Sequence, residues 1–443
     1  MIGNFEEYPE TLNRLFIEDK TRGLDAKTEG IYARTITFQV TEDCCMKCSY
    51  CYQHNKKPNV MTFEVAKQFI DDLLSGSDKL SNYIPKDTVG IVLEFIGGEP
   101  FLEIDLISKI TDYYFDECIR LRHPWAIKTR VSISTNGLLY FDPRVQRYLQ
   151  KHQHHLSLNI TVDGNKKLHD SCRFDLDGRG TYDRVIAAVD DYTRKYGKGS
   201  LPTKMTIAPG NVSNLYEAVV AMIEYGYPMV NFNPVYEDVW TTKDARVFYQ
   251  QLKKLADYLI DNNKLDPLVC PYLSPMYCHP MTPDDDHNWC GGTGAMLAID
   301  WQGNLYPCIR YMPNALGDSR VPYVIGTVKD GIRSTKEQCD RLDCLDCITR
   351  KSQSTDECFN CPIASGCGWC SGYCYELYGT PNKRTTFICD LHKARALALT
   401  YMWNKYYKKI KSKDVFKMDI PDDWALQIVD SDELSMLKQL VKE

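Results

Sequence analysis

Four cysteines lie within eight positions near the start of the chain, in the stretch DCCMKCSYCY. Cys44, Cys48 and Cys51 have the spacing C-x3-C-x2-C, and Cys45 falls outside it. Thiolates are soft ligands that suit zinc or iron–sulfur clusters. A structural zinc site wants four protein ligands, whereas three thiolates leave one iron of a [4Fe–4S] cluster free to bind a small molecule. A zinc knuckle and unconnected core thiols are the alternatives.

A second group of cysteines lies in the C-terminal part of the chain. Of 19 cysteines, nine fall between Cys339 and Cys389, and Cys290 and Cys308 precede them. The pattern reads C290-x12-G303-x4-C308, then C358-x2-C361-x5-C367-x2-C370-x3-C374, then Cys389. The structural alternative is a set of zinc-ribbon loops, in which bound zinc stabilises a small domain. Cys118 and Cys172 stand apart and are expected to be ordinary core thiols.

Composition excludes several classes of protein. The 443 residues are 44% hydrophobic and 25% charged, which is typical of a globular protein with sizeable cores. The net charge of −6 is spread out and gives no basic nucleic-acid footprint. We find no signal peptide and no apolar run of about 18 residues, so we expect a cytoplasmic protein that does not cross a membrane. Its cysteines are then better explained by metal binding than by disulfides.

Strands alternate with helices in the first half of the chain. We expect strands at 35–40, 91–96, 130–134, 156–162, 204–208 and 229–235, and helices at 63–74, 107–121, 182–196 and 215–226. This alternation predicts an α/β fold with a parallel sheet and right-handed crossovers. Six such units make a partial (β/α)6 barrel or an open doubly wound sheet.

The segments that follow these strands should meet at one mouth, because parallel sheets carry their chemistry at the carboxyl ends of their strands. The first strand is followed by the cysteines at 44–51. The later strands are followed by GGEP (97–100), STNG (134–137), TVDG (161–164) and APGNVSN (208–214). Each of these loops carries glycine or small polar residues.

The C-x3-C-x2-C motif with Tyr50 before its last cysteine, together with GGEP, resembles the radical S-adenosylmethionine (radical SAM) superfamily. The resemblance implies that Cys44, Cys48 and Cys51 hold a [4Fe–4S] cluster whose open iron binds S-adenosylmethionine. Reductive cleavage then gives a 5′-deoxyadenosyl radical that abstracts hydrogen. The residues implied in cofactor binding are Tyr50, Gly97, Gly98, Glu99, Ser134, Thr135, Asn136, Thr161, Asp163 and Arg173. Glu99 is expected to accept from the methionine ammonium, and Arg173 to pair with the carboxylate unless it is a surface arginine.

The second cysteine group resembles the SPASM extension of radical enzymes that modify peptides and proteins. That resemblance implies two auxiliary [4Fe–4S] clusters. The outer one would be held by Cys358, Cys361, Cys367 and Cys389. The inner one would be held by Cys290, Cys308 and either Cys370 or Cys374, with Cys370 slightly favoured. Its fourth ligand is open among Cys270, Cys278 and a substrate thiolate, and Cys339, Cys344 and Cys347 have no assigned role.

The expected domains follow from this resemblance. They are a lead-in (1–33), a radical SAM partial barrel (34–240), a helical linker (241–289), a SPASM auxiliary-cluster domain (290–395) and a helical tail (396–443). Only about 34 residues precede the first expected strand, so an N-terminal leader-binding domain is not expected. A leader peptide would then bind the barrel edge, the SPASM surface or a separate protein.

The segment 361–398 is most similar to peptide maturases whose targets carry repeated Cys-x-x-x units. The implied reaction abstracts hydrogen from a ribosomally made precursor peptide and adds a Cys thiolate to give a thioether. The surplus electron would leave through the inner auxiliary cluster, and an external donor such as a flavodoxin or ferredoxin would reduce the enzyme. No catalytic base is evident, and Asp163 and Glu237 are the weakly supported carboxylates near the mouth. The alternatives are an anaerobic sulfatase-maturating enzyme and a non-catalytic iron–sulfur or zinc protein.

Overall fold

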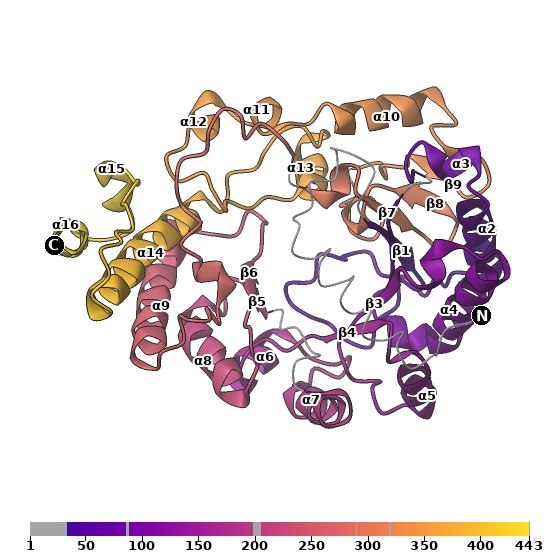
Figure 1. The fold of residues 1–443 in the computed structure, drawn as a ribbon, viewed down its shortest axis with the longest axis horizontal. Coiled ribbons are helices and arrows are strands. Elements are labelled where there is room, and N and C mark those ends of the chain that lie inside the picture. Colours follow the sequence, from indigo (N-terminus) through magenta and orange to yellow (C-terminus); the bar gives the residue numbers. More distant parts are fainter. Residues whose placement is uncertain (1–32, 86–87, 198–204, 289, 319, 443) are drawn as a thin grey trace.

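The computed structural model describes residues 33–442 except 86–87, 198–204, 289 and 319 (Figure 1). The strands are β1 (Arg34–Gln39), β2 (Ile91–Ile96), β3 (Thr129–Thr135), β4 (Leu156–Ile160), β5 (Met205–Ile207), β6 (Phe232–Pro234), β7 (Met296–Ile299), β8 (Asn304–Tyr306), β9 (Gly326–Thr327) and β10 (Gly331–Ile332). The longer helices are α2 (Phe63–Leu74), α4 (Ile104–Arg120), α5 (Pro143–His152), α7 (Tyr182–Tyr196), α8 (Leu215–Tyr225), α9 (Thr242–Asp261), α10 (Lys336–Asp346), α14 (Cys389–Lys409) and α16 (Ser431–Lys442). The shorter helices include α3 (Asp78–Ser81), α6 (Lys166–Cys172), α11 (Arg350–Gln353), α12 (Asp356–Phe359), α13 (Ser371–Tyr378) and α15 (Asp422–Ala425).

The first four strands form the parallel sheet that the sequence predicts. β1 pairs with β2, β2 with β3 and β3 with β4, all in parallel. β5 and β6 form a second parallel pair. Within the described residues no strand ladder joins β4 to β5, but the Thr206 amide at β5 donates to Asp163 Oδ1 after β4 at 2.9 Å. The α/β fold with a partial barrel is therefore confirmed, with a break between its fourth and fifth strands.

Apolar and polar side chains alternate along β1, so one face of the strand packs on a helical layer and the other faces the barrel interior. Ile36 and Phe38 are fully buried, and the Phe38 ring packs edge-on against Phe69 of α2 at 5.8 Å between ring centroids. Thr37 points to the other face of the sheet, where its hydroxyl donates to Glu94 at 2.7 Å. Each fully buried large apolar side chain contributes about 1.5–3 kcal/mol. This burial fixes the register of β1 and hence the position of the loop that follows it.

The C-terminal part of the chain extends the same sheet, which the sequence does not predict. β7 pairs with β1 in parallel, and the strand order is β10-β9-β8-β7-β1-β2-β3-β4. Figure 1 shows these later strands beside β1, at the opposite edge from β4. The cysteine-rich region is thus attached directly to the first barrel strand. Its strands are two to four residues long, so they carry too little alternation for a sequence pattern to reveal them.

Several helices differ from expectation. α5 and α6 are absent from the sequence prediction, although Asp142 caps α5 and Pro143 occupies its first turn. The helical tail expected from residue 396 in fact starts earlier, with α14 at Cys389, and this helix packs along α9. The lead-in expected over 1–33 lies almost wholly outside the described residues. Among the described helices, none has the length and apolar character needed to span a bilayer.

Candidate active site

The first cysteine loop lies at the carboxyl end of β1. Cys44, Cys48 and Cys51 are half-buried and line a common cavity of about 440 Å³. Ser49 N donates to Cys172 O at 2.9 Å, and Lys47 N donates to Phe174 O at 2.9 Å. These bonds tie the loop to the end of α6, so the three thiols are held by β1 on one side and α6 on the other.

The two glycines of GGEP let the loop after β2 press against the cysteine loop. Gly98 N donates to Thr41 O at 3.1 Å, and Glu99 N donates to Asp43 O at 2.8 Å. A β carbon at Gly98 would lie 2.2 Å from Asp43 O and 2.7 Å from the β carbon of Cys44. Only glycine fits this approach, so GGEP positions the first cysteine through backbone contact.

Glu99 joins the ends of β2 and β3. Its carboxylate is fully buried and accepts from Phe101 N at 3.0 Å, from Thr135 Oγ1 at 2.6 Å and from Asn136 N at 2.8 Å. Burial raises the pKa of Glu99, while these three donors lower it. The geometry assigns Glu99 a positioning role, and its expected contact with a methionine ammonium stays a prediction.

Cys45 has a partner that the sequence does not predict. The Asn136 side chain donates to Cys45 Sγ at 3.3 Å and lies 3.9 Å from Cys44 Sγ. Burial raises the pKa of Cys45 to about 12 and that of Cys48 to about 11. Burial also raises the pKa of Cys44. The charge of Arg173 acts to lower the pKa of Cys48, and the charge of Lys56 acts to lower that of Cys44. These two cations favour the thiolates that a metal centre requires.

Arg173 is buried, so the alternative of a surface arginine is wrong. It is 6% exposed, and its Nη1 donates to the Tyr50 hydroxyl at 2.8 Å. Tyr50 in turn donates to Asp163 Oδ2. Arg173 Nε has no hydrogen-bond partner within the described chain, and Arg173 lines the 440 Å³ cavity. A buried donor without an acceptor is costly, which suits a site that binds an anion. Ser134 and Thr161 also line this cavity.

The four cysteines predicted to hold the outer cluster come together. Cys358, Cys361, Cys367 and Cys389 all line one cavity of about 330 Å³. They come from α12, the loop that follows it and the first turn of α14. Arg384 lines the same cavity and donates to Cys367 O at 3.1 Å. Four soft ligands around a cavity with a cationic wall match the chemistry of a cluster-binding site.

The inner group is centred on Cys290, Cys308 and Cys370. A β carbon at Gly292 would lie 3.0 Å from Cys308 Sγ and 3.6 Å from Cys290 Sγ, so these two thiols converge on one glycine. Burial is the largest cause of the raised pKa of Cys308. The next largest causes are the charges of the neighbouring Cys370 and Cys290 thiols, in that order. Cys370 lines the 440 Å³ cavity, whereas Cys374 is fully buried one turn further along α13. The geometry favours Cys370 over Cys374 as the inner ligand.

The remaining cysteines do not join the inner group. Cys278 is buried, with its Sγ 3.8 Å from His392 Nε2, and its pKa is raised by burial and by the outer thiols Cys367 and Cys361. Cys270 is buried in the core. Cys339, Cys344 and Cys347 lie on α10 or at its end. Cys118 is a core thiol as expected, whereas Cys172 also lines a cavity, and its Sγ accepts from Asn211 at 3.4 Å.

A larger cavity of about 1000 Å³ opens beside the first cysteine loop. Its walls include Cys44, Cys48, Cys51, Ala208, Gly210, Val235, Glu237 and Val239. Leu176 and Val239 also line it and are 54% and 46% exposed. Arg310, which sequence reasoning missed, joins this region to the inner cysteines. It pairs with Glu237 at 3.0 Å, and its guanidinium lies 4.6 Å from the centre of the Tyr52 ring.

The cysteine groups surround cavities and do not form compact single-ion sites. Across the described residues, no three His, Cys, Asp or Glu side chains are close enough to hold one metal ion. A cubic cluster places each cysteine on a different iron, so its ligands stand apart. The fold and the three cysteine groups define a partial-barrel protein with a cysteine-rich extension.

Comparison with known proteins agrees with this class. Residues 28–186 match the family Fer4_12, described as a 4Fe-4S single cluster domain. The radical SAM cyclopropyl synthase TigE of Paramaledivibacter caminithermalis is 21% identical over 449 aligned residues, covering 91% of this chain and 80% of that protein. A cysteine-type anaerobic sulfatase-maturating enzyme of Clostridium perfringens is 25% identical over 162 residues, 34% of this chain and 38% of that one.

Solved structures share the fold. The structure titled native anSMEcpe with bound AdoMet and Kp18Cys peptide aligns with a TM-score of 0.57 at 17% identity, covering 86% of this chain and 98% of that chain. Streptococcus suis SuiB bound to precursor peptide SuiA aligns with a TM-score of 0.50 at 14% identity, covering 87% and 82%. The chain is therefore similar, in sequence and in fold, to a radical SAM cyclopropyl synthase and to anaerobic sulfatase-maturating enzymes.

Proposed function

We propose that this chain is a radical SAM enzyme that matures a ribosomally made peptide. The observation that carries the proposal is the 440 Å³ cavity. It is lined by Cys44, Cys48 and Cys51, and also by Cys370 of the inner auxiliary group. One continuous space therefore connects the site expected to generate a radical with the site expected to accept an electron.

The residues present fit the implied cofactors. Cys44, Cys48 and Cys51 would hold the first [4Fe–4S] cluster, and the buried Arg173 would receive the carboxylate of S-adenosylmethionine at its unpartnered Nε. Bound together, cluster and S-adenosylmethionine supply a 5′-deoxyadenosyl radical. Glu99 and the GGEP glycines would hold in place the loops that surround these groups.

The two auxiliary sites complete the proposed electron path. The inner cluster would be held by Cys290, Cys308 and Cys370, with a position left for a fourth ligand. The outer cluster would be held by Cys358, Cys361, Cys367 and Cys389, as their shared cavity supports. An external carrier such as a flavodoxin or ferredoxin would supply and receive electrons, as expected in an anaerobic cytoplasm.

The peptide would enter through the 1000 Å³ cavity, which reaches the first cysteine loop. We propose that a C–H bond of an acceptor residue and the S–H bond of a peptide cysteine are replaced by one C–S bond. The hydrogen atom would go to the radical that the bound cofactors supply and the thiol proton to solvent, and a cluster held by Cys290, Cys308 and Cys370 would accept the surplus electron. Arg310 lines the 440 Å³ cavity together with Cys370, and its charge opposes the rise that burial causes in the pKa of the Cys370 thiol.

The relatives favour two other reaction products as further candidates. TigE, whose name assigns it cyclopropyl synthesis, matches 91% of the chain, which favours carbon–carbon ring closure as a second candidate. The sulfatase-maturating relatives favour oxidation of a single Cys to formylglycine.

The test is anaerobic incubation of the reduced, reconstituted chain with S-adenosylmethionine and candidate Cys-containing peptides encoded beside its gene, read by mass spectrometry. A thioether predicts loss of two hydrogens together with loss of one alkylatable thiol. Loss of two hydrogens with the thiol intact supports ring closure instead. Replacement of sulfur by oxygen together with loss of two hydrogens supports sulfatase-type maturation to formylglycine. If 5′-deoxyadenosine does not form with any peptide, the proposed enzyme class is wrong.

A further inference from the structure

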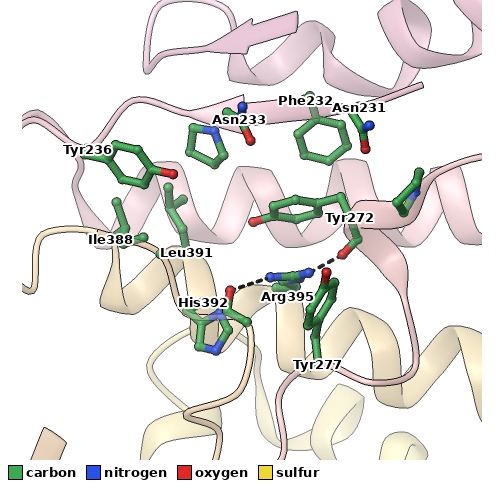
Figure 2. A pocket seen from close by; sticks show the side chains of 14 residues that line it. Asn231, Phe232, Asn233, Tyr236, Tyr272, Tyr277, Ile388, Leu391, His392 and Arg395 are labelled. Atoms are coloured by element: carbon green, nitrogen blue, oxygen red, sulfur yellow. Dashed lines mark hydrogen bonds between the residues drawn. The ribbon is translucent and has the colours of Figure 1, made fainter. Parts of the chain in front are cut away.

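A smaller cavity of about 240 Å³ is lined by residues of β6, α14 and the loops beside them (Figure 2). We call it the Arg395 pocket. It is lined by Asn231, Phe232, Asn233, Pro234, Tyr236, Pro271, Tyr272, Tyr277, Gly366, Gly368, Ile388, Leu391, His392 and Arg395. Asn233, Pro234 and Tyr236 also line the 440 Å³ cavity, so the two spaces share a wall. Drug-sized ligands occupy about 300–1,000 Å³, so the smaller pocket is sized for a single side chain.

Arg395 is the charged group of this pocket. It is 4% exposed and is held by two backbone oxygens, Tyr272 O at 2.8 Å from Nε and Gly366 O at 2.9 Å from Nη1. Its guanidinium lies 4.1 Å from the ring centre of Tyr272 and 4.2 Å from that of Tyr277. Figure 2 shows it between the two rings. The guanidinium is therefore fixed in orientation before any ligand arrives.

No carboxylate in the described chain forms an ion pair with Arg395, and the pocket contains no other charged lining residue. Outside the pocket, its charge acts to lower the pKa of the Cys367 thiol. His392 is neutral, because burial lowers its pKa to about 3. A guanidinium carries five N–H donors, and the hydrogen bonds to Tyr272 O and Gly366 O use two of them. A buried cation without a counter-ion is costly unless an anion binds.

Hydroxyl groups add further donors. The hydroxyls of Tyr236 and Tyr272 point toward one another across the pocket in Figure 2, and that of Tyr277 lies beside the guanidinium. None of the three has a hydrogen-bond partner within the residues described. Burial raises the pKa of Tyr236 and of Tyr272, so both remain protonated donors. Donors outnumber acceptors at this pocket, which is the arrangement that recognises a carboxylate.

We infer that the Arg395 pocket binds a carboxylate of the peptide substrate, next to the residue that is modified. The carboxylate would pair with the free N–H groups of Arg395 and accept from the tyrosine hydroxyls, while the aromatic rings cover its aliphatic stem. This inference rests on the proposed function for the identity of the occupant. It adds a requirement on the sequence of the peptide substrate: an acidic side chain or the C-terminal carboxylate lies close to the residue that is modified.

Binding can be tested without catalysis, using the anaerobically reconstituted full-length chain and ligand-observed NMR titration. The probes are N-acetyl-L-glutamate α-amide, its neutral analogue N-acetyl-L-glutamine α-amide, and N-acetyl-L-glutamine with a free α-carboxylate. A hydrogen bond to a charged group is worth about 1.5–3 kcal/mol, so at least one acidic probe should bind about tenfold or more tightly than the neutral one. Preference for the first or the third probe assigns the carboxylate to a side chain or to a C-terminus.

Variants locate the binding to this pocket. Asn233 is an exposed residue on the shared wall, and Asn233→Asp places a like charge there and should weaken the acidic probe at least about tenfold. Tyr272→Phe removes one donor and keeps the ring, and should weaken it about threefold or more. Gln150→Glu makes the matched charge change on the exposed face of α5 and should leave binding unchanged.

Equal binding of acidic and neutral probes, or an Asn233→Asp variant that binds as well as wild type, would overturn the inference. In that case Arg395 serves only the neighbouring outer cysteines, whose thiol Cys367 feels its charge. Because these titrations need no S-adenosylmethionine and no reductant, their outcome is independent of whether the chain matures a peptide. A chain that binds the acidic probe but cleaves no S-adenosylmethionine would refute the proposed function alone.

Discussion

Replacing Gly98 with alanine should displace the first cysteine loop. The added β carbon would lie 2.2 Å from Asp43 O and 2.7 Å from the β carbon of Cys44, well inside van der Waals contact. Neither neighbour is the flexible end of a side chain, so the backbone must move. Overpacking of this kind costs about 1–3 kcal/mol. The displacement falls on the first of the three thiols and should therefore prevent closure of the first cluster.

The assay has three readouts, which are urea unfolding, the iron and sulfide content after anaerobic reconstitution, and the cleavage of S-adenosylmethionine. We expect Gly98→Ala to lower the free energy of unfolding by about 1–3 kcal/mol and the iron content from about twelve to about eight atoms per chain. Gly210→Ala is the matched control, because a β carbon there meets nothing within 4 Å, and it should change stability by less than about 0.5 kcal/mol. A Gly98→Ala protein with full iron content and normal cleavage of S-adenosylmethionine would refute the argument.

Three further predictions concern the remaining sites. Cys370→Ser should lose the inner cluster, whereas Cys374→Ser should keep most of its iron, as measured by iron analysis. Arg173→Lys should weaken S-adenosylmethionine binding about tenfold or more, since lysine cannot reproduce the guanidinium geometry, and equilibrium dialysis checks this. Burial lowers the pKa of His169 to about 3, so the folded state holds this side chain neutral. The contribution of His169 to the free energy of unfolding is therefore complete above about pH 6.5 and declines as the pH falls below that value. Near pH 5 the loss should be about 2 kcal/mol, and His169→Gln should flatten the urea-unfolding profile over this range while the exposed His154→Gln does not.

The barrel could be predicted from sequence because its strands are long and regular. Residues 91–96 alternate between buried and half-buried positions over most of the strand, and the helix at 63–74 has its apolar residues on one face. These patterns depend on local periodicity, which sequence displays directly. The added strands β7 to β10 could not be predicted, because a two-residue strand such as Gly326–Thr327 has no periodicity and forms only through long-range pairing.

The cysteine groups were predictable, but their surroundings were not. The resemblance to the SPASM extension implied that Cys358, Cys361, Cys367 and Cys389 belong together, and these four cysteines line one cavity. It could not separate Cys370 from Cys374, since that choice depends on which side of α13 faces the cavity. The roles of Asn136 beside Cys45, Arg310 beside Glu237 and Arg395 between its tyrosines all depend on contacts between distant segments, for which no local pattern exists.

The most direct test of the account is 5′-deoxyadenosine formation by two single-cysteine variants. Cys48→Ala removes a proposed cluster ligand, and Cys45→Ala removes the neighbouring thiol that instead accepts from Asn136. The reconstituted, reduced proteins are incubated with S-adenosylmethionine and the nucleoside product is measured by mass spectrometry. The account predicts no product from Cys48→Ala and substantial product from Cys45→Ala. Equal product from both variants, or product from Cys48→Ala alone, would contradict the assignment of the first cluster to Cys44, Cys48 and Cys51.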